Sequence, residues 1–254
     1  MFTSRMKFSH LKPLALLLLV LIAVSCDRDE KSPSDINNSV FPGDFLSDKL
    51  YNTLVIEVVY VEGQEPTKAA LDNMVSFLGQ RLNKPAGITI VQRSIATPGR
   101  TTIDVNVIRE IEKTNRQKVT GGKQLTAWIY FSDAEYSSNS GNSKVLGVAY
   151  GYSSIAIFEK TVKEFTGGID KPSQAVLETT ILTHEFGHVL GLVNNGTSMV
   201  GTHQDTAHSS HCTDTECLMY YKVESNVIAG DVLGSGVPGL DANCLADLKA
   251  AGGK

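Results

Sequence analysis

Residues 184–188 read HEFGH, and their types and spacing can carry out chemistry. On a helix, residues four apart share a face, so His184 and His188 can present two imidazoles to one metal ion. Zinc lowers the pKa of a bound water from 15.7 to about 7, which makes a nucleophile available at neutral pH. Glu185 lies beside such an ion and can accept a proton from that water. The pattern therefore predicts zinc-dependent hydrolysis with Glu185 as the general base.

The histidines of the chain are concentrated around this segment. A buried helix with two ordinary histidines would also fit HEFGH, but it gives no reason for further histidines to gather nearby. The chain has six histidines; His10 lies near the N-terminus, and the other five lie within 28 residues, namely His184, His188, His203, His208 and His211. This concentration favours a metal site over the purely structural alternative.

A zinc site of this kind needs a third protein ligand, and residue 194, three after Gly191, is Asn rather than His. Further along, residues 211–219 read HCTDTECLM. The two segments together resemble the metzincin zinc peptidases, whose signature is HExxHxxGxxH followed by a methionine turn. The resemblance is closest to the archaemetzincin pattern, in which the third histidine is followed by C-x4-C-x-M. It implies that His211 is the third zinc ligand and Met219 the Met-turn methionine. The 17 residues 194–210, rich in turn-forming types, then read as an inserted loop.

Other residues compete for the place of the third ligand. Within the insertion His203 is the strongest rival, because the loop could fold back so that His203 binds zinc and His211 only supports it. His208 and Asp205 are expected at the surface. A gluzincin-like site would use Glu224, but a methionine stands where a Met-turn is expected, which disfavours that reading.

Three cysteines follow the HEFGH segment: Cys212, Cys217 and Cys244. In archaemetzincins two cysteines after the third histidine and a later CxxC hold a second, structural zinc. Only one later cysteine is present here, which puts that second zinc in doubt. Because an exported protein meets an oxidising compartment, a disulfide is expected, most simply Cys212–Cys217. A zinc site of all three cysteines completed by a histidine stays open as the alternative.

The N-terminus carries the marks of export. Residues 1–25 combine basic residues with an apolar run at 14–24 and end in AVS before Cys26, which resembles the lipobox of bacterial lipoproteins. The resemblance implies a lipid on Cys26 and an exported, outer-membrane lipoprotein at the cell surface or periplasmic face; an ordinary secretory signal is the alternative. Residues 26–49 are expected to be a flexible tether or short prosegment. Residues 41–44, FPGD, resemble the aspartate switch of astacin propeptides, with Asp44 as the blocking residue, although a simple turn explains them too.

Apolar periodicity and turn residues predict the elements of one domain, residues 50–254. Strands are expected at 53–63, 87–95 and 125–133 and as a pair within 144–160; helices are expected at 66–82, 105–116, 173–190 and 240–250. This order predicts an α+β fold whose N-terminal part is α/β-like. The resemblance implies a metzincin-like zincin: a twisted mixed sheet, the HExxH helix beneath it, and a loop-rich C-terminal part. The 144–160 pair should supply an edge strand above the cleft, where a peptide pairs by strand addition.

These features together predict a lipid-anchored, monomeric zinc endopeptidase with one catalytic ion. Zinc is held by His184, His188 and His211, and the substrate is a protein or peptide. Tyr221 matches a tyrosine that some metzincins place near zinc, where it can donate a hydrogen bond to the developing oxyanion; a purely structural aromatic is the alternative. The net charge of −4 gives no reason to expect nucleic acid. The competing hypothesis is an inactive, metal- or protein-binding lipoprotein with the same fold.

Overall fold

A computed structural model of the chain describes residues 1–2 and 40–254. Residues 3–25 of the expected leader, Cys26 and the expected tether up to residue 39 lie outside the described residues. Within the described part of the chain, no helix is long and apolar enough to cross a membrane.

A five-stranded sheet forms the centre of the fold, with strand order β2-β1-β4-β7-β6. The strands are β1 Thr53–Val61, β2 Ile88–Ile95, β4 Gln124–Phe131, β6 Gly147–Tyr150 and β7 Ser154–Ile157. The first four in the order are parallel neighbours, whereas β6 runs antiparallel to β7 at the edge. A separate two-stranded sheet joins β3 Thr102–Ile103 to β5 Glu135–Tyr136. The mixed, mostly parallel sheet confirms the predicted fold class, and the 144–160 segment does supply the edge strand.

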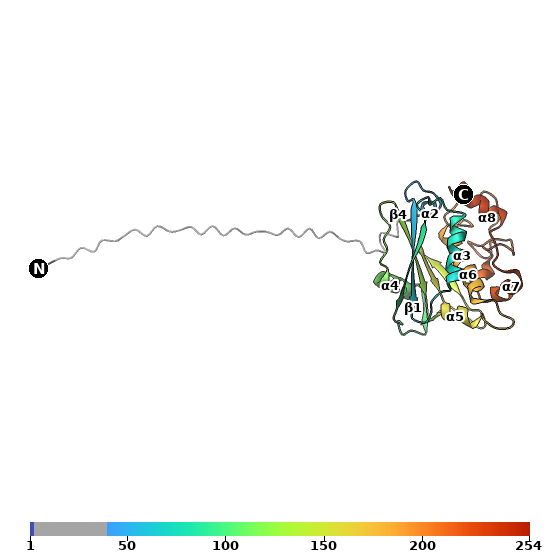
Figure 1. The fold of residues 1–254 in the computed structure, drawn as a ribbon, viewed down its shortest axis with the longest axis horizontal. Helices are drawn as coiled ribbons and strands as arrows, with labels where there is room; N and C mark the ends of the chain where they lie inside the picture. Colours follow the sequence, from blue (N-terminus) through green and yellow to red (C-terminus); the bar gives the residue numbers. More distant parts are fainter. Residues whose placement is uncertain (3–39) are drawn as a thin grey trace. The chain divides into compact units, whose positions relative to one another are not determined.

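Helices cover both faces of this sheet (Figure 1). Helices α3 Lys68–Gly79 and α6 Gln174–Val189 pack on one face, and α4 Val105–Asn115 packs on the other. Alternation along the strands supplies an apolar surface to each side: in β4, Ile129 and Phe131 join the α3–α6 side, and Trp128 and Tyr130 join the α4 side. The period-two pattern that predicted the strands thus also builds two cores.

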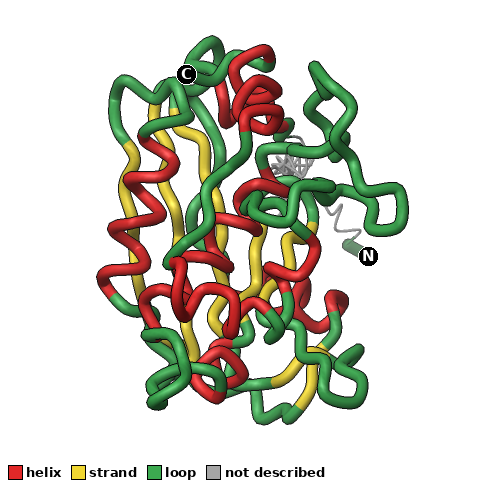
Figure 2. Tube along the Cα trace, turned by 90° about the vertical axis from the view of Figure 1, so that its right-hand side faces the viewer, coloured by secondary structure: helices red, strands yellow, loops and turns green. Residues whose placement is uncertain are grey.

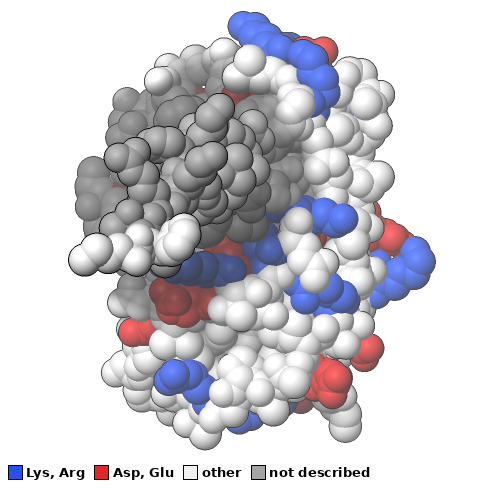
Figure 3. Space-filling view, turned by 90° about the vertical axis from the view of Figure 1, so that its left-hand side faces the viewer, with Lys and Arg blue, Asp and Glu red and all other residues white. Residues whose placement is uncertain are grey.

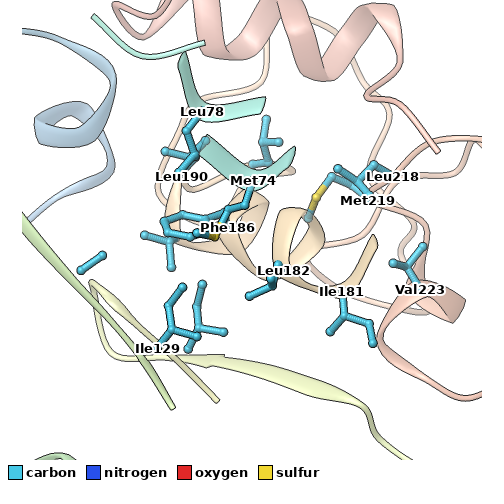
Figure 4. Close-up of a cluster of buried hydrophobic side chains, with 14 of the residues drawn as sticks. Met74, Leu78, Ile129, Ile181, Leu182, Phe186, Leu190, Leu218, Met219 and Val223 are labelled. Atoms are coloured by element: carbon cyan, nitrogen blue, oxygen red, sulfur yellow. The ribbon is translucent and has the colours of Figure 1, made fainter. Parts of the chain in front are cut away.

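The larger core lies between the sheet and α6 (Figure 4). Met74 and Leu78 of α3 lie beside Phe186 of α6, while Ile129 approaches from the sheet and Met219 from a later loop. Each of these side chains is fully buried. Because α6 is enclosed by sheet, helix and loop, its position is fixed from several sides.

The C-terminal part is rich in loops, as predicted. Figure 2 looks onto this face, where green loops run among the helices in front of the strands. Its helical elements are the single turn η1 Tyr221–Glu224, α7 Ile228–Ser235 and α8 Ala242–Ala250. Of these, only α8 was expected from the sequence. On the opposite face, Figure 3 shows basic and acidic side chains scattered among uncharged ones where grey atoms do not cover it.

Two short helices appear where none was expected. Helix α5 Glu159–Glu164 follows β7, and α2 Pro42–Leu46 lies within the segment expected to be a flexible tether. Phe45 and Leu46 of α2 are fully buried in the core, which explains why residues 42–46 are ordered instead.

Candidate metal centre

Helix α6 carries the HEFGH segment and is held at both ends. Ser173 caps its N-terminus by accepting a hydrogen bond from Val176 N. At its C-terminus, Gly191 has φ +74°, and an added Cβ would lie 2.7 Å from Thr197 N, so only glycine fits. The chain therefore turns away from the helix three residues after His188 and enters the insertion.

Three histidines from two segments converge beside this helix. His184 Nε2 and His188 Nε2 are 3.0 Å apart, and the His211 ring lies 5.4 Å and 5.0 Å from their ring centres. The nearest ligand atoms of these three residues and of Glu224 all lie within 4.8 Å of one another. The structure thus brings His211 to the HEFGH histidines, across the 17-residue insertion that separates them in sequence.

Hydrogen bonds fix how two of these rings are protonated. His184 Nδ1 lies 2.7 Å from Leu218 O, and His211 Nδ1 lies 3.1 Å from Ser209 O. A carbonyl oxygen can only accept, so each Nδ1 carries the proton and each Nε2 keeps its lone pair. His211 Nε2 is buried and makes no hydrogen bond, and its nearest acceptor is Glu224 Oε2 at 3.6 Å. Two bare imidazole nitrogens facing one point, one of them orphaned, fit a divalent metal such as zinc.

Burial keeps the HEFGH histidines neutral. It lowers the pKa of His184 to about 4, and it lowers the pKa of His188 well below its ordinary value with a further contribution from the neighbouring imidazoles. Neutral imidazoles are the form that binds metal, so these side chains are ready to accept a cation at neutral pH.

Glu185 is buried beside the cluster with both carboxylate oxygens lacking a hydrogen-bond partner. Burial, reinforced by the charge of Glu224, raises the pKa of Glu185 well above its ordinary value. On the sheet side its neighbour is Gly147 of β6, where an added Cβ would lie 2.9 Å from Glu185 Oε1. The side chain therefore stands between the histidines and the edge strand.

Met219 supports α6 from below the histidines, in the place expected for the Met-turn. Its side chain is fully buried and directed at the helix (Figure 4). A Cβ added at Gly187 would overlap Met219 Sδ, so the glycine in HEFGH makes room for this methionine. Leu218, one residue before, supplies the carbonyl that holds His184.

The single turn η1 brings Glu224 to the histidine cluster and carries Tyr221, whose ring packs on His208. Glu224 Oε2 lies 3.6 Å from His211 Nε2; partial burial would raise the pKa of Glu224, but the contact with His211 lowers it below its ordinary value. Glu224 accompanies His211 in the cluster and does not replace it. Tyr221 stacks on His208, with ring centres 3.6 Å apart, and His208 pairs with Asp205. The His208 side chain is 41% exposed, as expected for a residue at the surface.

Asp44 is not among the carboxylates at this cluster. Asp44 Oδ2 accepts a hydrogen bond from Phe41 N at 2.9 Å, which closes the first turn of α2. The FPGD segment is therefore a helix start, and the aspartate of the suggested switch is engaged by its own backbone. Phe41 instead packs edge-on against Tyr152, and both line a hollow of about 280 Å³ that reaches His188.

A second group of potential metal ligands lies deeper, around the cysteines. Cys212, Cys217 and Cys244 are buried free thiols, so the expected Cys212–Cys217 disulfide is wrong. His203 Nδ1 lies 3.4 Å from Cys212 Sγ and 3.9 Å from Cys244 Sγ, and together with Asp241 these residues form a group whose ligand atoms all lie within 4.8 Å of one another. Cys217 Sγ lies 3.7 Å from Cys244 Sγ. His203, the rival for third ligand at the first cluster, belongs to this second one. Sequence spacing could not reveal this, because the course of the insertion decides where His203 lies.

Comparisons with protein-family models and with curated proteins found no match. Among solved structures, archaemetzincin from Methanopyrus kandleri is similar at 14% identity and a TM-score of 0.54, covering 79% of this chain and 96% of that one. A zinc-dependent peptidase from Methanocorpusculum labreanum matches at 13% identity and a TM-score of 0.46, covering 76% of this chain and 99% of that one. Metalloproteinase-II from Bacteroides fragilis matches at 12% identity and a TM-score of 0.44, covering 87% and 60%. The first of these establishes that this chain has an archaemetzincin-like zincin fold.

Proposed function

We propose that this chain is a zinc-dependent endopeptidase whose ion is held by His184, His188 and His211. One observation carries the proposal: imidazole nitrogens left bare by their own hydrogen bonds converge beside the buried, unpartnered carboxylate of Glu185. A structural role for these groups would leave polar atoms buried without partners, which is costly. A bound cation removes that cost.

A zinc ion in such a site acts as a Lewis acid that polarises a peptide carbonyl and makes water acidic near neutral pH. Glu185 is the group placed to take up the proton, because its carboxylate is buried beside the histidines and its nearest backbone donor, the N–H of Ala149, makes no well-aligned hydrogen bond to it. Burial raises the pKa of Glu185 above its ordinary value, which favours holding that proton until it passes to the leaving amine. Tyr221 is proposed to donate a hydrogen bond to the oxyanion that develops on the substrate.

The edge strand β6 is proposed to bind the substrate. It is the last strand of the sheet order, and its residue Gly147 lies directly beside Glu185. An extended peptide that pairs with this edge would bring a backbone carbonyl toward the histidines. This supports protein or peptide substrates over small esters or amides.

The test is cleavage of casein by the purified full chain, with and without a zinc chelator. The proposal expects proteolysis that the chelator abolishes and added zinc restores. A chain that binds zinc at the histidines but cleaves nothing across a wide pH range would instead favour the alternative, a catalytically inactive binding protein with this fold.

We also propose that the chain acts as a monomer and is exported with a lipid on Cys26. The apolar run and the AVSC sequence support lipidation. Mass spectrometry of the mature N-terminus, with Cys26→Ser as control, tests it: a diacylglyceryl cysteine is expected, and an unmodified thiol at that position would contradict it.

A further inference from the structure

The hollow of about 280 Å³ beside the histidine cluster has no part in the chemistry proposed above. It is lined by residues 41–43 at the start of α2, 151–152 in the turn between β6 and β7, 188–189 at the end of α6 and 195–196 in the insertion. Because His188 belongs to both, the hollow borders the candidate metal centre. Its volume is below the usual range of small-molecule sites, so it fits a single side chain better than a separate ligand.

Two exposed aromatic side chains line this hollow. Phe41 is 63% exposed and Tyr152 is 49% exposed, although each is a large ring beside a candidate active site. The rings pack edge-on with their centroids 6.2 Å apart. Aromatic rings contribute a large apolar area when they are covered, so the pair offers a surface that a bound apolar group would remove from water.

The α2 side of the hollow is fixed in place. A Cβ added at Gly191 would lie 2.7 Å from Pro42 Cγ, and one added at Gly196 would lie 3.1 Å from the same atom. Pro42 is thus packed closely against the end of α6 and the start of the insertion. Phe45 and Leu46 anchor the other end of α2 in the core. A wall that is already ordered loses little conformational entropy when it binds a ligand.

The residues that line the hollow favour an uncharged occupant. Among the described residues of its lining there is no Asp, Glu, Lys or Arg. A charged side chain that entered would lose its water without gaining a counter-charge, which is costly. A large apolar side chain would instead cover the rings of Phe41 and Tyr152.

The edge strand β6 leads from the candidate catalytic group to this hollow. Gly147 lies beside Glu185, and Gly151, four residues later, lines the hollow. A strand advances about 3.3 Å per residue, so these two points are roughly 13 Å apart along the edge. A peptide paired antiparallel to β6, the more stable mode of pairing, places its amino-terminal side over the hollow. The side chain that enters then belongs to a residue within about four positions before the cleaved bond.

We propose that Phe41 and Tyr152 form a substrate subsite that selects a large apolar side chain on the amino-terminal side of the cleaved bond. This inference rests on the proposed function, because it extends the path of the peptide that pairs with β6. It also changes the role of residues 41–46, which were expected to be a tether or prosegment. They become part of the substrate-binding wall of the active chain.

Peptide affinity is measured in the zinc-loaded full chain that carries Glu185→Gln, so that slow cleavage does not interfere. Short labelled peptides of serine and threonine carry one central phenylalanine, leucine, alanine, lysine or glutamate, and fluorescence anisotropy gives each Kd. The phenylalanine and leucine peptides should bind about tenfold more tightly than the others. Tyr152→Ala or Phe41→Ala should remove this preference, and Tyr152→Phe should keep it. Leu50→Ala is the matched control, because Leu50 is 60% exposed and does not line the hollow.

A filling variant guards against a change that merely disturbs the fold. Gly43 lines the hollow and has open space at its Cβ position. Gly43→Leu should therefore narrow the hollow without a clash, and it should weaken binding of the phenylalanine peptide while the alanine peptide binds as before.

The subsite is refuted if the phenylalanine and alanine peptides bind equally or not at all, or if the preference survives both Tyr152→Ala and Phe41→Ala. Because the assay measures affinity alone, a chain that shows the preference but cleaves no casein would refute the proposed function and still support the subsite. In the unchanged chain, mass spectrometry of the products should place the phenylalanine within about four residues before the cut. A phenylalanine consistently after the cut would contradict the assignment to the amino-terminal side.

Discussion

At the scale of single residues, each position of HEFGH has a structural reason. His184 and His188 face the cluster, Glu185 faces the edge strand, and Phe186 fills the core. Gly187 completes the set, since its missing side chain is the space that Met219 occupies. Packing therefore explains Phe186 and Gly187. Metal binding and proton transfer are the proposed reasons for the other three residues of HEFGH.

Gly187→Ala tests this packing. The added methyl overlaps Met219 Sδ, so the loop must shift, and we expect a loss of about 1–3 kcal/mol in the free energy of unfolding. Urea denaturation measures it. Gly79→Ala is the matched control, because Gly79 ends α3 with open space at its Cβ and should tolerate alanine. Equal stability of the two variants would contradict the packing account.

The residues of the first cluster could be named from sequence because their spacing is local or marked by a motif. His211 was identified by the Cys-x4-Cys-x-Met tail that follows it. His203 could not be placed, since its neighbours Cys244 and Asp247 lie more than 40 residues away and no periodicity links them. An oxidising compartment favoured a disulfide over the alternative of three cysteines completed by a histidine, and the sequence could not show which histidine lies near the thiols.

At the scale of elements, α6 is held by buried carboxyls as well as apolar contacts. Gln174 Nε2 of α6 donates to Glu159 Oε1 of α5 at 2.8 Å and to Glu178 Oε1 at 2.9 Å. Thr67, the cap of α3, donates to Glu178 through its backbone N–H. Three helices therefore meet at two acidic side chains, both fully buried.

Because these carboxyl groups are buried, the free energy of unfolding should depend on pH. Burial, together with Glu178, raises the pKa of Glu159 to about 9 from an ordinary 4.5. As pH rises, Glu159 therefore loses its carboxyl proton in the unfolded chain before it does so in the folded chain. The contribution of Glu159 to stability falls as pH rises from about 4.5 to about 9. Unfolding midpoints in urea at pH 5, 7 and 9 should therefore decline less in Glu159→Gln than in the unchanged chain. Parallel declines would show that Glu159 ionises normally in the fold.

The long elements and the short strand pair β6–β7 were predictable, and the short helices were not. Helix α3 carries a helical period, whereas β4 and α6 are long apolar runs bounded by turn or cap residues. Helices α2, α5 and η1 have four to six residues, so they show no period, and packing decides them. In α2 the decisive contacts are those of Phe45 and Leu46, which the sequence shows only as two apolar residues in a polar stretch.

At the level of the whole molecule, α6 packs on the sheet and presents two of the candidate metal ligands. The remaining ligands come from the loop-rich C-terminal part. His211 and Glu224 come from the loop-rich C-terminal part, as do all the thiols of the second cluster. Such a part has little regular backbone pairing of its own, so bound metal should contribute strongly to its order.

Removing the metal should therefore lower the midpoint temperature of unfolding. In the metal-free chain, a fall in pH from about 6.5 to 4 should lower this midpoint further. Burial holds the pKa of His184 at about 4, against 6.5 when exposed, so below pH 6.5 the unfolded chain takes up the proton first. The contribution of His184 to the stability of the stripped chain is then lost between about pH 6.5 and 4. Stripped His184→Gln is the control, and calorimetry should show that it loses less stability over this window. A stripped chain as stable as the zinc-loaded one would contradict the role of the metal.

The central claim is that Glu185 transfers protons beside a zinc ion that three histidines hold. The most direct measurement pairs zinc content with casein cleavage in Glu185→Gln, a variant of nearly the same shape. Glu185→Gln should bind as much zinc as the unchanged chain and cleave casein roughly 10²–10⁴-fold more slowly, the usual contribution of a general base. Cleavage at the original rate with zinc still bound would contradict it.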